Sequence, residues 1–250
     1  MQLHYVLEGS GPGLLFVHGW CGESSHFDRQ IGSLRGDYRV LVPDLPWHGQ
    51  SPREGEITIE AFSAALAELL DELGGTPVAV VGHSMGGCIA VELATSRPDL
   101  VSSVMILDSG FAIAPEHVEA MTHQAARYEG PDRDEAIDQL TAGMFAPSDD
   151  PGLRKRLIDQ IRDAPVEVLV EGTRTMVDFM AGPGDAKYAG LDLPVALVSG
   201  STPFSDIERL RPLRPETHFA QVLSAGHYVQ LFAAPQIDAM IRQFLTVAGD

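Results

Sequence analysis

The segment Gly82-His83-Ser84-Met85-Gly86-Gly87 is the feature that most constrains how this chain can fold. It follows the apolar run Val78–Val81 and precedes an apolar stretch near Met85, so it predicts a strand, a sharp turn and a helix. The glycines at both ends of the turn remove side chains that would collide there, which leaves the Ser84 hydroxyl exposed at the helix N-terminus. Free amides and the helix dipole favour negative charge at that point, so Ser84 is a candidate nucleophile.

Short runs rich in Val, Ile and Leu recur along the chain and predict buried parallel strands joined by helices. The expected strands are Leu14–Val17, Arg39–Val42, Val78–Val81, Ser103–Leu107, Val195–Ser199 and Phe219–Leu223. Helices are expected at Ile59–Leu73, behind a Thr58 N-cap, and at about Gln236–Val247. This alternation indicates an α/β protein with a mostly parallel central sheet flanked by helices.

The alternation stops between about residues 111 and 187, where helical segments follow one another without a strand pattern. We interpret this stretch as a helical lid, inserted after the strand that ends near Leu107, within a single domain of 250 residues. Methionine and phenylalanine side chains of the lid are adaptable enough to line a pocket. The residues expected around the substrate are His83, Phe111, Met144, Phe145 and Tyr228.

Composition limits the partners that this chain can have. Its 35 acidic residues outnumber 17 Lys and Arg, a formal net charge of −18, which argues against a nucleic-acid partner because phosphates need clustered cations. Without an apolar stretch of roughly 20 residues or a secretory signal pattern, the chain is expected to be soluble, cytoplasmic and free of a membrane partner. The two cysteines, Cys21 and Cys88, lack metal-type spacing, so neither a metal nor a cofactor is expected. A monomer or homodimer is the expected state.

Three motifs together resemble the α/β-hydrolase superfamily, over nearly all of the chain outside the lid. They are the Ser84 turn, His18-Gly19-Trp20 after the first predicted strand, and Ala225-Gly226-His227-Tyr228 after the last. The resemblance implies an α/β-hydrolase fold in which His227 is the general base, a role that suits a histidine near neutral pH. It also implies an oxyanion hole formed by the backbone amides of Trp20 and Met85. A further segment, Asp44 to Ser51, resembles a structural loop of the family, with Trp47 where a glycine is usual.

The acidic member of the triad is the open question. In this superfamily it usually follows the strand predicted at Val195–Ser199, but the corresponding position here is Pro203, which has no carboxylate. Asp108 and Asp206 are the two substitutes. Some family members carry the acid after the earlier strand, where Asp108 stands, whereas an N-cap role would explain Asp206 without catalysis. The predicted triad is therefore Ser84, Asp108 and His227, with Asp206 as the alternative acid.

This constellation predicts a carboxylesterase-like serine hydrolase that cleaves an ester of a small or medium apolar substrate through an acyl-enzyme. The fold does not decide the reaction, because C–C bond hydrolases, lactonases and thioesterases use the same residues. The chain also resembles cofactor-independent dioxygenases of the same fold, in Trp20-Cys21, in His83-Ser84 and in an acid after the earlier strand. A non-catalytic binding protein is the last alternative.

Overall fold

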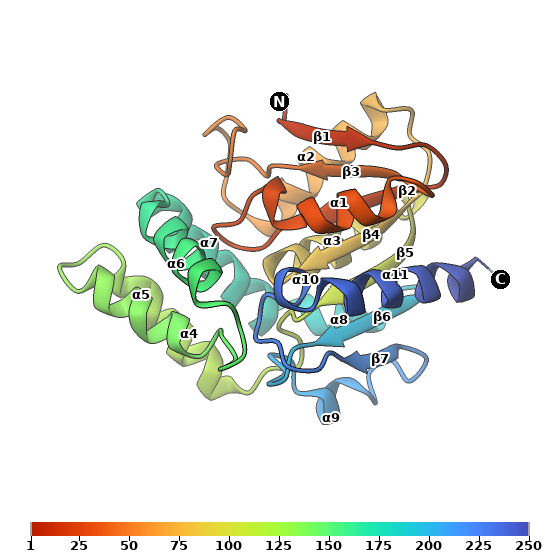
Figure 1. The fold of residues 1–250 in the computed structure, drawn as a ribbon. Helices are drawn as coiled ribbons and strands as arrows, with labels where there is room; N and C mark the ends of the chain where they lie inside the picture. Colours follow the sequence, from red (N-terminus) through yellow and green to blue (C-terminus); the bar gives the residue numbers. More distant parts are fainter. Residues whose placement is uncertain (1, 250) are drawn as a thin grey trace.

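The computed structural model describes residues 2–249, and in this part of the chain seven strands form one sheet in the order β1-β3-β2-β4-β5-β6-β7 (Figure 1). The strands are β1 (Tyr5–Glu8), β2 (Gly13–Val17), β3 (Arg39–Pro43), β4 (Val78–His83), β5 (Val101–Leu107), β6 (Val195–Ser199) and β7 (His218–Gln221). Strand β1 pairs antiparallel with β3, and the other pairs are parallel. The predicted mostly parallel sheet is thus confirmed, with β4 at its centre.

The sequence pattern missed β1 and placed the end of the last strand two residues too far. Strand β1 lies at the sheet edge, and no residue in it is fully buried, so it lacks the apolar run that marks the central strands. The predicted final strand reached Leu223, which is instead highly exposed beyond the end of β7.

Helices cover both faces of the sheet because alternate strand residues point to opposite sides. One apolar cluster joins Leu14 and Phe16 to α1 (Asp28–Leu34) and α11 (Ala234–Ala248). The other joins Leu15 and Val17 to α2 (Ile59–Glu72) and α3 (Met85–Ser96). The Thr58 hydroxyl accepts a hydrogen bond from the Ala61 N–H at 3.1 Å, as expected for the N-cap of α2.

Five successive helices separate β5 from β6, all within the described residues. They are α4 (Pro115–Arg127), α5 (Arg133–Ala142), α6 (Pro151–Asp163), α7 (Val166–Ala181) and α8 (Gly184–Ala189). Helices α4 to α7 pack together beside the sheet, whereas α8 lies against α3 (Figure 1). We call residues 115–189 the helical insertion. It contains the run of helices that the sequence predicted, while its action as a lid stays a prediction.

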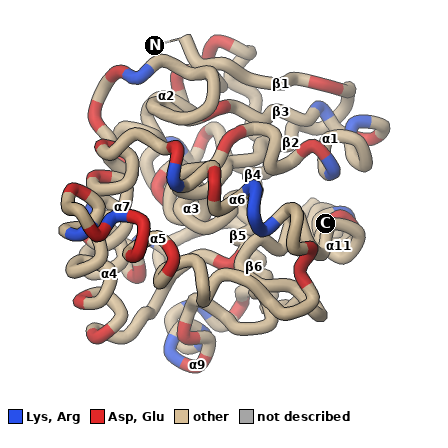
Figure 2. Tube along the Cα trace, turned by 60° about the vertical axis from the view of Figure 1, so that its left-hand side comes forward, with Lys and Arg blue, Asp and Glu red and all other residues tan. Residues whose placement is uncertain are grey.

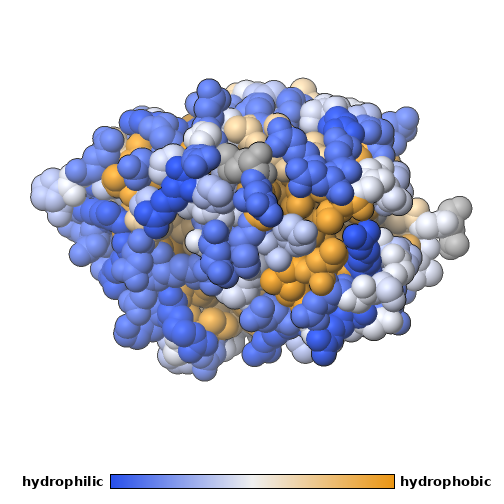
Figure 3. All heavy atoms as spheres, turned by 90° about the horizontal axis from the view of Figure 1, so that it is seen from above, coloured by the Kyte–Doolittle hydropathy of each residue, from blue (hydrophilic) through white to orange (hydrophobic). Residues whose placement is uncertain are grey.

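The surface is dominated by polar and charged side chains. Asp and Glu recur over the loops and the helical insertion, with Lys and Arg dispersed between them (Figure 2). Hydrophilic residues cover most of the face seen in Figure 3, and apolar residues appear there as separate patches. Over the described residues, none of the helices combines the length and apolarity needed to cross a membrane.

Candidate active site

Ser84 occupies the turn between β4 and α3, at φ 53° and ψ −121°. A non-glycine residue rarely adopts a positive φ, so the turn must be held by its surroundings. A side chain at Gly82 would collide with the carbonyl of Gly86, and one at Gly86 would collide with the carbonyl of Val17. The Ser84 N–H donates to the carbonyl of Leu107 at 2.9 Å, which ties the turn to β5.

His227 lies in the loop between β7 and α10 (Val229–Phe232), and its Nδ1–H donates to Oδ2 of Asp108 at 2.8 Å. Asp108 is buried directly after β5. Its other oxygen accepts the backbone N–H of Gly200 at 3.0 Å, at the end of β6. Two hydrogen bonds therefore orient this carboxylate and leave Nε2 of His227 available as a base.

The alternative acid has a different role. The Asp206 carboxylate accepts the Arg209 N–H at 3.2 Å and so caps the short helix α9 (Ile207–Leu210). Of the two candidate acids, the structure brings Asp108 to His227. It leaves Asp206 at a helix N-terminus.

The amides expected to form the oxyanion hole are free to donate. Met85 is the first residue of α3, so its N–H has no acceptor within the helix. Among residues 2–249, neither this N–H nor that of Trp20 donates to a backbone carbonyl. The loop that carries Trp20 passes close to the nucleophile, since a Cβ added at Gly19 would lie 3.0 Å from Cβ of Ser84. This arrangement could bind negative charge that develops beside Ser84.

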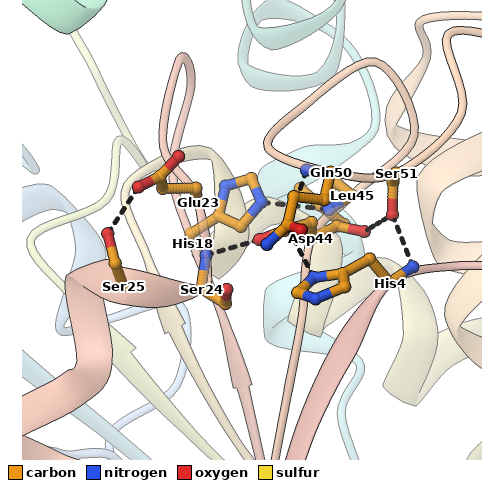
Figure 4. A network of polar contacts seen from close by, with 9 residues as sticks. All are labelled: His4, His18, Glu23, Ser24, Ser25, Asp44, Leu45, Gln50 and Ser51. Carbon is orange, nitrogen blue, oxygen red and sulfur yellow. Dashed lines mark hydrogen bonds and ion pairs between the residues drawn. The ribbon is translucent and has the colours of Figure 1, made fainter.

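A buried carboxylate supports the loop that follows Trp20. Figure 4 shows Asp44, which follows β3, at the centre of a polar network. It accepts the backbone N–H groups of Ser24 at 2.6 Å and Gln50 at 2.9 Å, and it contacts Nδ1 of His4 at 2.9 Å. Burial alone would raise the pKa of Asp44, but the donated N–H groups outweigh it and hold the pKa below its usual value. The carboxylate therefore stays charged and ties two loops together.

His18 supports the same loop from inside. Its Nδ1–H donates to the carbonyl of Gly19 at 2.8 Å. Its Nε2 accepts the N–H of Leu45 at 3.0 Å (Figure 4), so one neutral tautomer satisfies both hydrogen bonds. Burial, together with neighbouring His48, lowers the pKa of His18 to about 3. The ring is therefore a fixed hydrogen-bonding element at neutral pH and not a proton carrier.

The backbone conformation at Trp47 accounts for the glycine that is usual at this position in the family. Its φ is 70°, in the left-handed region that glycine enters at least cost. The indole Nε1–H donates to the carbonyl of Gly55 at 3.0 Å, which helps to hold this strained conformation.

Ser84 and His227 line one cavity of about 90 Å³ between the sheet edge and the helical insertion. Its walls are largely apolar, and five methionines contribute to them: Met85, Met121, Met144, Met176 and Met180. Of the residues expected around the substrate, His83, Met144 and Tyr228 lie here. Phe145 lines a neighbouring cavity on the side of Asp108 and His227.

Phe111 does not reach the cavity that contains Ser84. Its ring is fully buried, 5.4 Å from the ring of Tyr188 and 6.4 Å from that of Phe179. Phe111, at the start of the predicted lid, was one of the residues expected around the substrate. However, the Phe111 N–H bonds to the Ser205 hydroxyl at 3.1 Å and the side chain packs into the core.

Several lining residues, Gln124 and Tyr128 among them, were not anticipated from the sequence, whereas Met121 is one of the lid methionines that were expected to line a pocket. Met121, Gln124 and Tyr128 line the cavity from α4 and the residue that ends it. Their spacing of three and then four positions places them on one helix face, a signal that was present in the sequence. Whether that face lies toward the cavity depends on how α4 packs against α7, which the spacing does not determine.

His83 is fully buried beside His227, with the two ring centroids 4.7 Å apart. Its Nε2–H donates to the backbone carbonyl of His227 at 3.0 Å, which helps to position the loop of the candidate base. Burial, reinforced by His227, lowers the pKa of His83 well below its ordinary value, so the ring is neutral.

The helical insertion is hydrogen-bonded to the loop that carries His227. The His227 N–H donates to the carbonyl of Met144 at 2.7 Å. The buried carboxylate of Asp149 accepts the N–H groups of Ala146 at 2.8 Å and Gly226 at 3.2 Å. The position of His227 is thus coupled to residues 144–149 of the insertion.

Within residues 2–249, His, Cys, Asp and Glu side chains form no group of three that could hold a metal ion.

A family profile described as alpha/beta hydrolase fold matches residues 12–143. Lipase LipV of Mycobacterium tuberculosis is 35% identical over 168 residues, which are 66% of this chain and 64% of the lipase. The match therefore spans slightly less than two thirds of that relative.

Two solved structures resemble the chain over almost its full length. An enol-lactonase from Burkholderia xenovorans has a TM-score of 0.85 and 20% identity, with 98% of this chain and 96% of that chain covered. A thermophilic esterase from Thermogutta terrifontis has a TM-score of 0.85 and 24% identity, with 98% and 93% covered. At these identities, the likeness shows a shared fold.

Proposed function

The chain belongs to the α/β-hydrolase superfamily, and from this premise we propose that it is a serine hydrolase that cleaves carboxylic esters of small or medium apolar substrates. The observation that carries the proposal is the pairing of Asp108 with His227 beside Ser84, on a cavity that the free amides of Trp20 and Met85 border. This combination supplies a nucleophile, a base, an orienting acid and oxyanion donors.

In the proposed first half-reaction, Nε2 of His227 accepts the proton of Ser84 as its Oγ attacks the ester carbonyl. Asp108 holds the imidazole in the tautomer that leaves Nε2 unprotonated and stabilises the imidazolium that forms. The amides of Trp20 and Met85 donate to the oxyanion, an effect that typically accounts for about 10²- to 10³-fold in rate per donor. The imidazolium then protonates the departing alcohol, which leaves an acyl group on Ser84.

In the second half-reaction, His227 removes a proton from water, which attacks the acyl carbonyl. The same oxyanion donors stabilise the second tetrahedral intermediate, and collapse returns the proton to Ser84 and releases the acid. Because His83 is neutral and bonded to the backbone of His227, we assign it a positioning role in both steps.

The cavity supports a preference for short acyl groups. Its volume of about 90 Å³ has room for only a few water molecules, and methionines form much of its wall. Methionine side chains rearrange at small cost, so somewhat longer chains could enter if the helical insertion moves as a lid.

The proposal is tested by the hydrolysis of p-nitrophenyl acetate and p-nitrophenyl octanoate by the wild-type protein and by Ser84→Ala. We expect the acetate to be the better substrate and the serine variant to lose at least about 10³-fold in kcat, the cost of removing a nucleophile. A fluorophosphonate should label the wild type but not the variant. Turnover by Ser84→Ala at the wild-type rate would rule out this mechanism.

Lactones and thioesters are the nearest alternative substrates, because they react by the same two steps. Cleavage of a C–C bond is a further alternative within the same class. Parallel assays with a lactone, an acyl thioester and a diketone would rank these activities, and all of them should depend on Ser84.

Oxygen chemistry is the second candidate function, favoured by the position of Asp108 directly after β5 and by the His83-Ser84 pair. In the dioxygenases that the sequence resembles, the histidine is a base on a heteroaromatic substrate. Oxygen uptake with a hydroxyquinolone, retained by Ser84→Ala but lost in a His227→Ala variant, would favour this reading over ester hydrolysis.

A further inference from the structure

The segment between α5 and α6 lies against the loop that carries the candidate base. It ends in the turn Ala146-Pro147-Ser148-Asp149, with proline at the second position, where β-turns favour it. The Asp149 N–H donates to the carbonyl of Ala146 at 3.1 Å, and the Ala146 N–H donates to Oδ2 of Asp149 at 2.8 Å. Two reciprocal hydrogen bonds therefore close the turn. We call residues 144–149 the clasp.

Asp149 joins this turn to the loop of His227. The residue is only 3% exposed, and the same oxygen that accepts the Ala146 N–H also accepts the Gly226 N–H at 3.2 Å. A buried carboxylate is costly unless hydrogen bonds satisfy it, so Asp149 favours the arrangement in which both N–H groups are in place. Loss of this side chain would leave both donors without their acceptor.

Gly226 lies between the clasp and the segment that supports Asp108. A Cβ added at Gly226 would collide with the carbonyl of Met144 and lie 2.7 Å from Cα of Phe145. A Cβ added at Gly200 would collide with the carbonyl of Gly226, and the Gly200 N–H is the group that donates to Asp108. The clasp, the loop of the base and the support of the acid are thus in direct contact.

Two further contacts hold the clasp to the same loop. The Ser148 hydroxyl donates to the carbonyl of Ser224 at 3.0 Å. Ser224 has a φ of 57°, a left-handed conformation that its surroundings must hold. The ring of Phe145 stacks on that of Tyr228 with the centroids 5.7 Å apart. The clasp therefore contacts the loop on both sides of His227 in the chain.

Met144 connects the clasp to the substrate cavity. It lines the cavity at Ser84, and its carbonyl accepts the His227 N–H at 2.7 Å. A movement of the insertion that widened the cavity at Met144 would also pull on the loop of His227. Part of the cavity wall and the candidate base should therefore move together.

We propose that Asp149 is a positioning residue for His227, which it aligns with Ser84 by docking the clasp onto the loop of the base. This rests on the proposed function, in which His227 is the general base. It gives the helical insertion a role beyond covering the cavity, because undocking of the clasp would displace the base and docking would restore it. A misplacement of about 1 Å can cost about 10²-fold in rate, so a small displacement is sufficient.

Asp149→Ala removes the acceptor of both N–H groups. We expect kcat for p-nitrophenyl acetate to fall by about 10- to 100-fold with KM within about twofold, because the alignment of the base serves the chemical steps. Asp149→Asn keeps an oxygen that can accept both N–H groups, so its kcat should stay within about threefold of wild type. Ser148→Ala, at an exposed position, should lose about two- to threefold, the effect of a single hydrogen bond.

Asp150→Ala is the matched control. The Asp150 carboxylate accepts the Leu153 N–H at 2.7 Å and caps α6, and within residues 2–249 it makes no hydrogen bond to residues 224–228. Both alanine variants should lower the melting temperature, because each loses a carboxylate that satisfies a backbone N–H. Only Asp149→Ala should lower kcat. An equal loss of kcat in the two variants would show a general effect of destabilising the insertion and would overturn the proposal.

The ¹H NMR signal of the His227 Nδ1 proton reports the position of the base without a substrate. This proton is held in the hydrogen bond to Asp108 and should give a resolved low-field resonance that is absent in His227→Ala. The resonance should broaden or vanish in Asp149→Ala and persist in Asp149→Asn and Asp150→Ala. That result would uphold the inference even if the wild type hydrolysed no ester, in which case the proposed function alone would fail. An unchanged resonance with wild-type kcat in Asp149→Ala would overturn the inference and leave ester hydrolysis through Ser84 intact.

Discussion

The carboxylate of Asp108 lies 2.8 Å from the imidazole of His227, although 119 positions separate the two residues in the chain. Strands β5 and β6 are neighbours in the sheet, and β7 follows β6 at the edge. The parallel register brings the carboxyl ends of these strands together, so a side chain just after β5 reaches a loop just after β7. The segment after β6 contributes the Gly200 N–H, which donates a hydrogen bond to Asp108. It does not contribute the carboxylate that pairs with His227.

Replacement of Asp108 by Asn should lower kcat for p-nitrophenyl acetate by about 10³- to 10⁴-fold. The amide would favour the wrong tautomer of His227 and would not stabilise the imidazolium. Asp206→Asn is the control, because Asn also caps helices well and its activity should stay within about twofold of wild type. A large loss in the control together with full activity in Asp108→Asn would reverse the assignment.

Gly19→Ala should reduce kcat by about tenfold or more with little change in KM. The added methyl group would lie 3.0 Å from Cβ of Ser84 and 3.1 Å from Nδ1 of His83, so the loop that carries Trp20 and these neighbours must move apart by a few tenths of an ångström. Because oxyanion donors act on charge formed in the transition state, the loss should appear in kcat. Gly32→Ala in α1 meets no atom within 4 Å and should be as active as wild type and slightly more stable.

Trp20→Phe should loosen the helical insertion. The indole Nε1–H donates to the carbonyl of Val168 on α7 at 2.9 Å, and the ring packs against Gly172 one turn later. Loss of this bond and of ring volume should lower the free energy of unfolding by about 1–3 kcal/mol. Backbone hydrogen exchange in α7 should become faster, and activity on the octanoate should rise relative to the acetate.

Trp47→Phe is the comparison for that variant. It also removes an indole hydrogen bond, here to Gly55 at 3.0 Å, but on a loop outside the insertion. It should leave exchange in α7 at the wild-type rate. Identical exchange profiles for both variants would contradict a tether through Trp20.

Stability should fall as the pH is lowered from 7.5 to 5.5. Burial, as the main cause, lowers the pKa of His18 to about 3 and that of His48 to about 4, whereas both residues titrate near 6.5 in an unfolded chain. The unfolded state therefore binds more protons across this window, and stability is lost as the pH falls below about 6.5. These two histidines together should account for about 3 kcal/mol of the decrease.

Urea unfolding at both pH values measures this effect. His48→Asn keeps a donor for the carbonyl of Pro46 but removes one titrating group, so the difference between the two pH values should shrink by about 1.4 kcal/mol. His117→Gln, at an exposed position on α4, should leave the difference unchanged. A pH-independent wild type would show that these rings titrate alike in both states.

The turn at Ser84 was predicted from local patterns, and the position of His227 near it was expected from the resemblance to the α/β-hydrolase superfamily. A glycine-flanked serine between an apolar strand and an apolar helix can satisfy its backbone in few ways, and His227 follows the last strand pattern directly. The central strands were equally clear, because buried parallel strands carry uninterrupted apolar runs. Strand β1 was missed because a half-exposed edge strand carries no such run.

Tertiary structure alone decided which acid meets His227 and which side chains surround the substrate. Asp108 and Asp206 both end or follow strand patterns, so local sequence does not distinguish them. The pairing of β5 with β6 does distinguish them, and it is a contact between segments far apart in the chain. Phe111 and Tyr128 are both aromatic residues between β5 and β6, yet one packs in the core and the other lines the cavity. Periodicity marks which face of a helix is apolar, but the neighbour against which that face packs depends on contacts between helices distant in the chain.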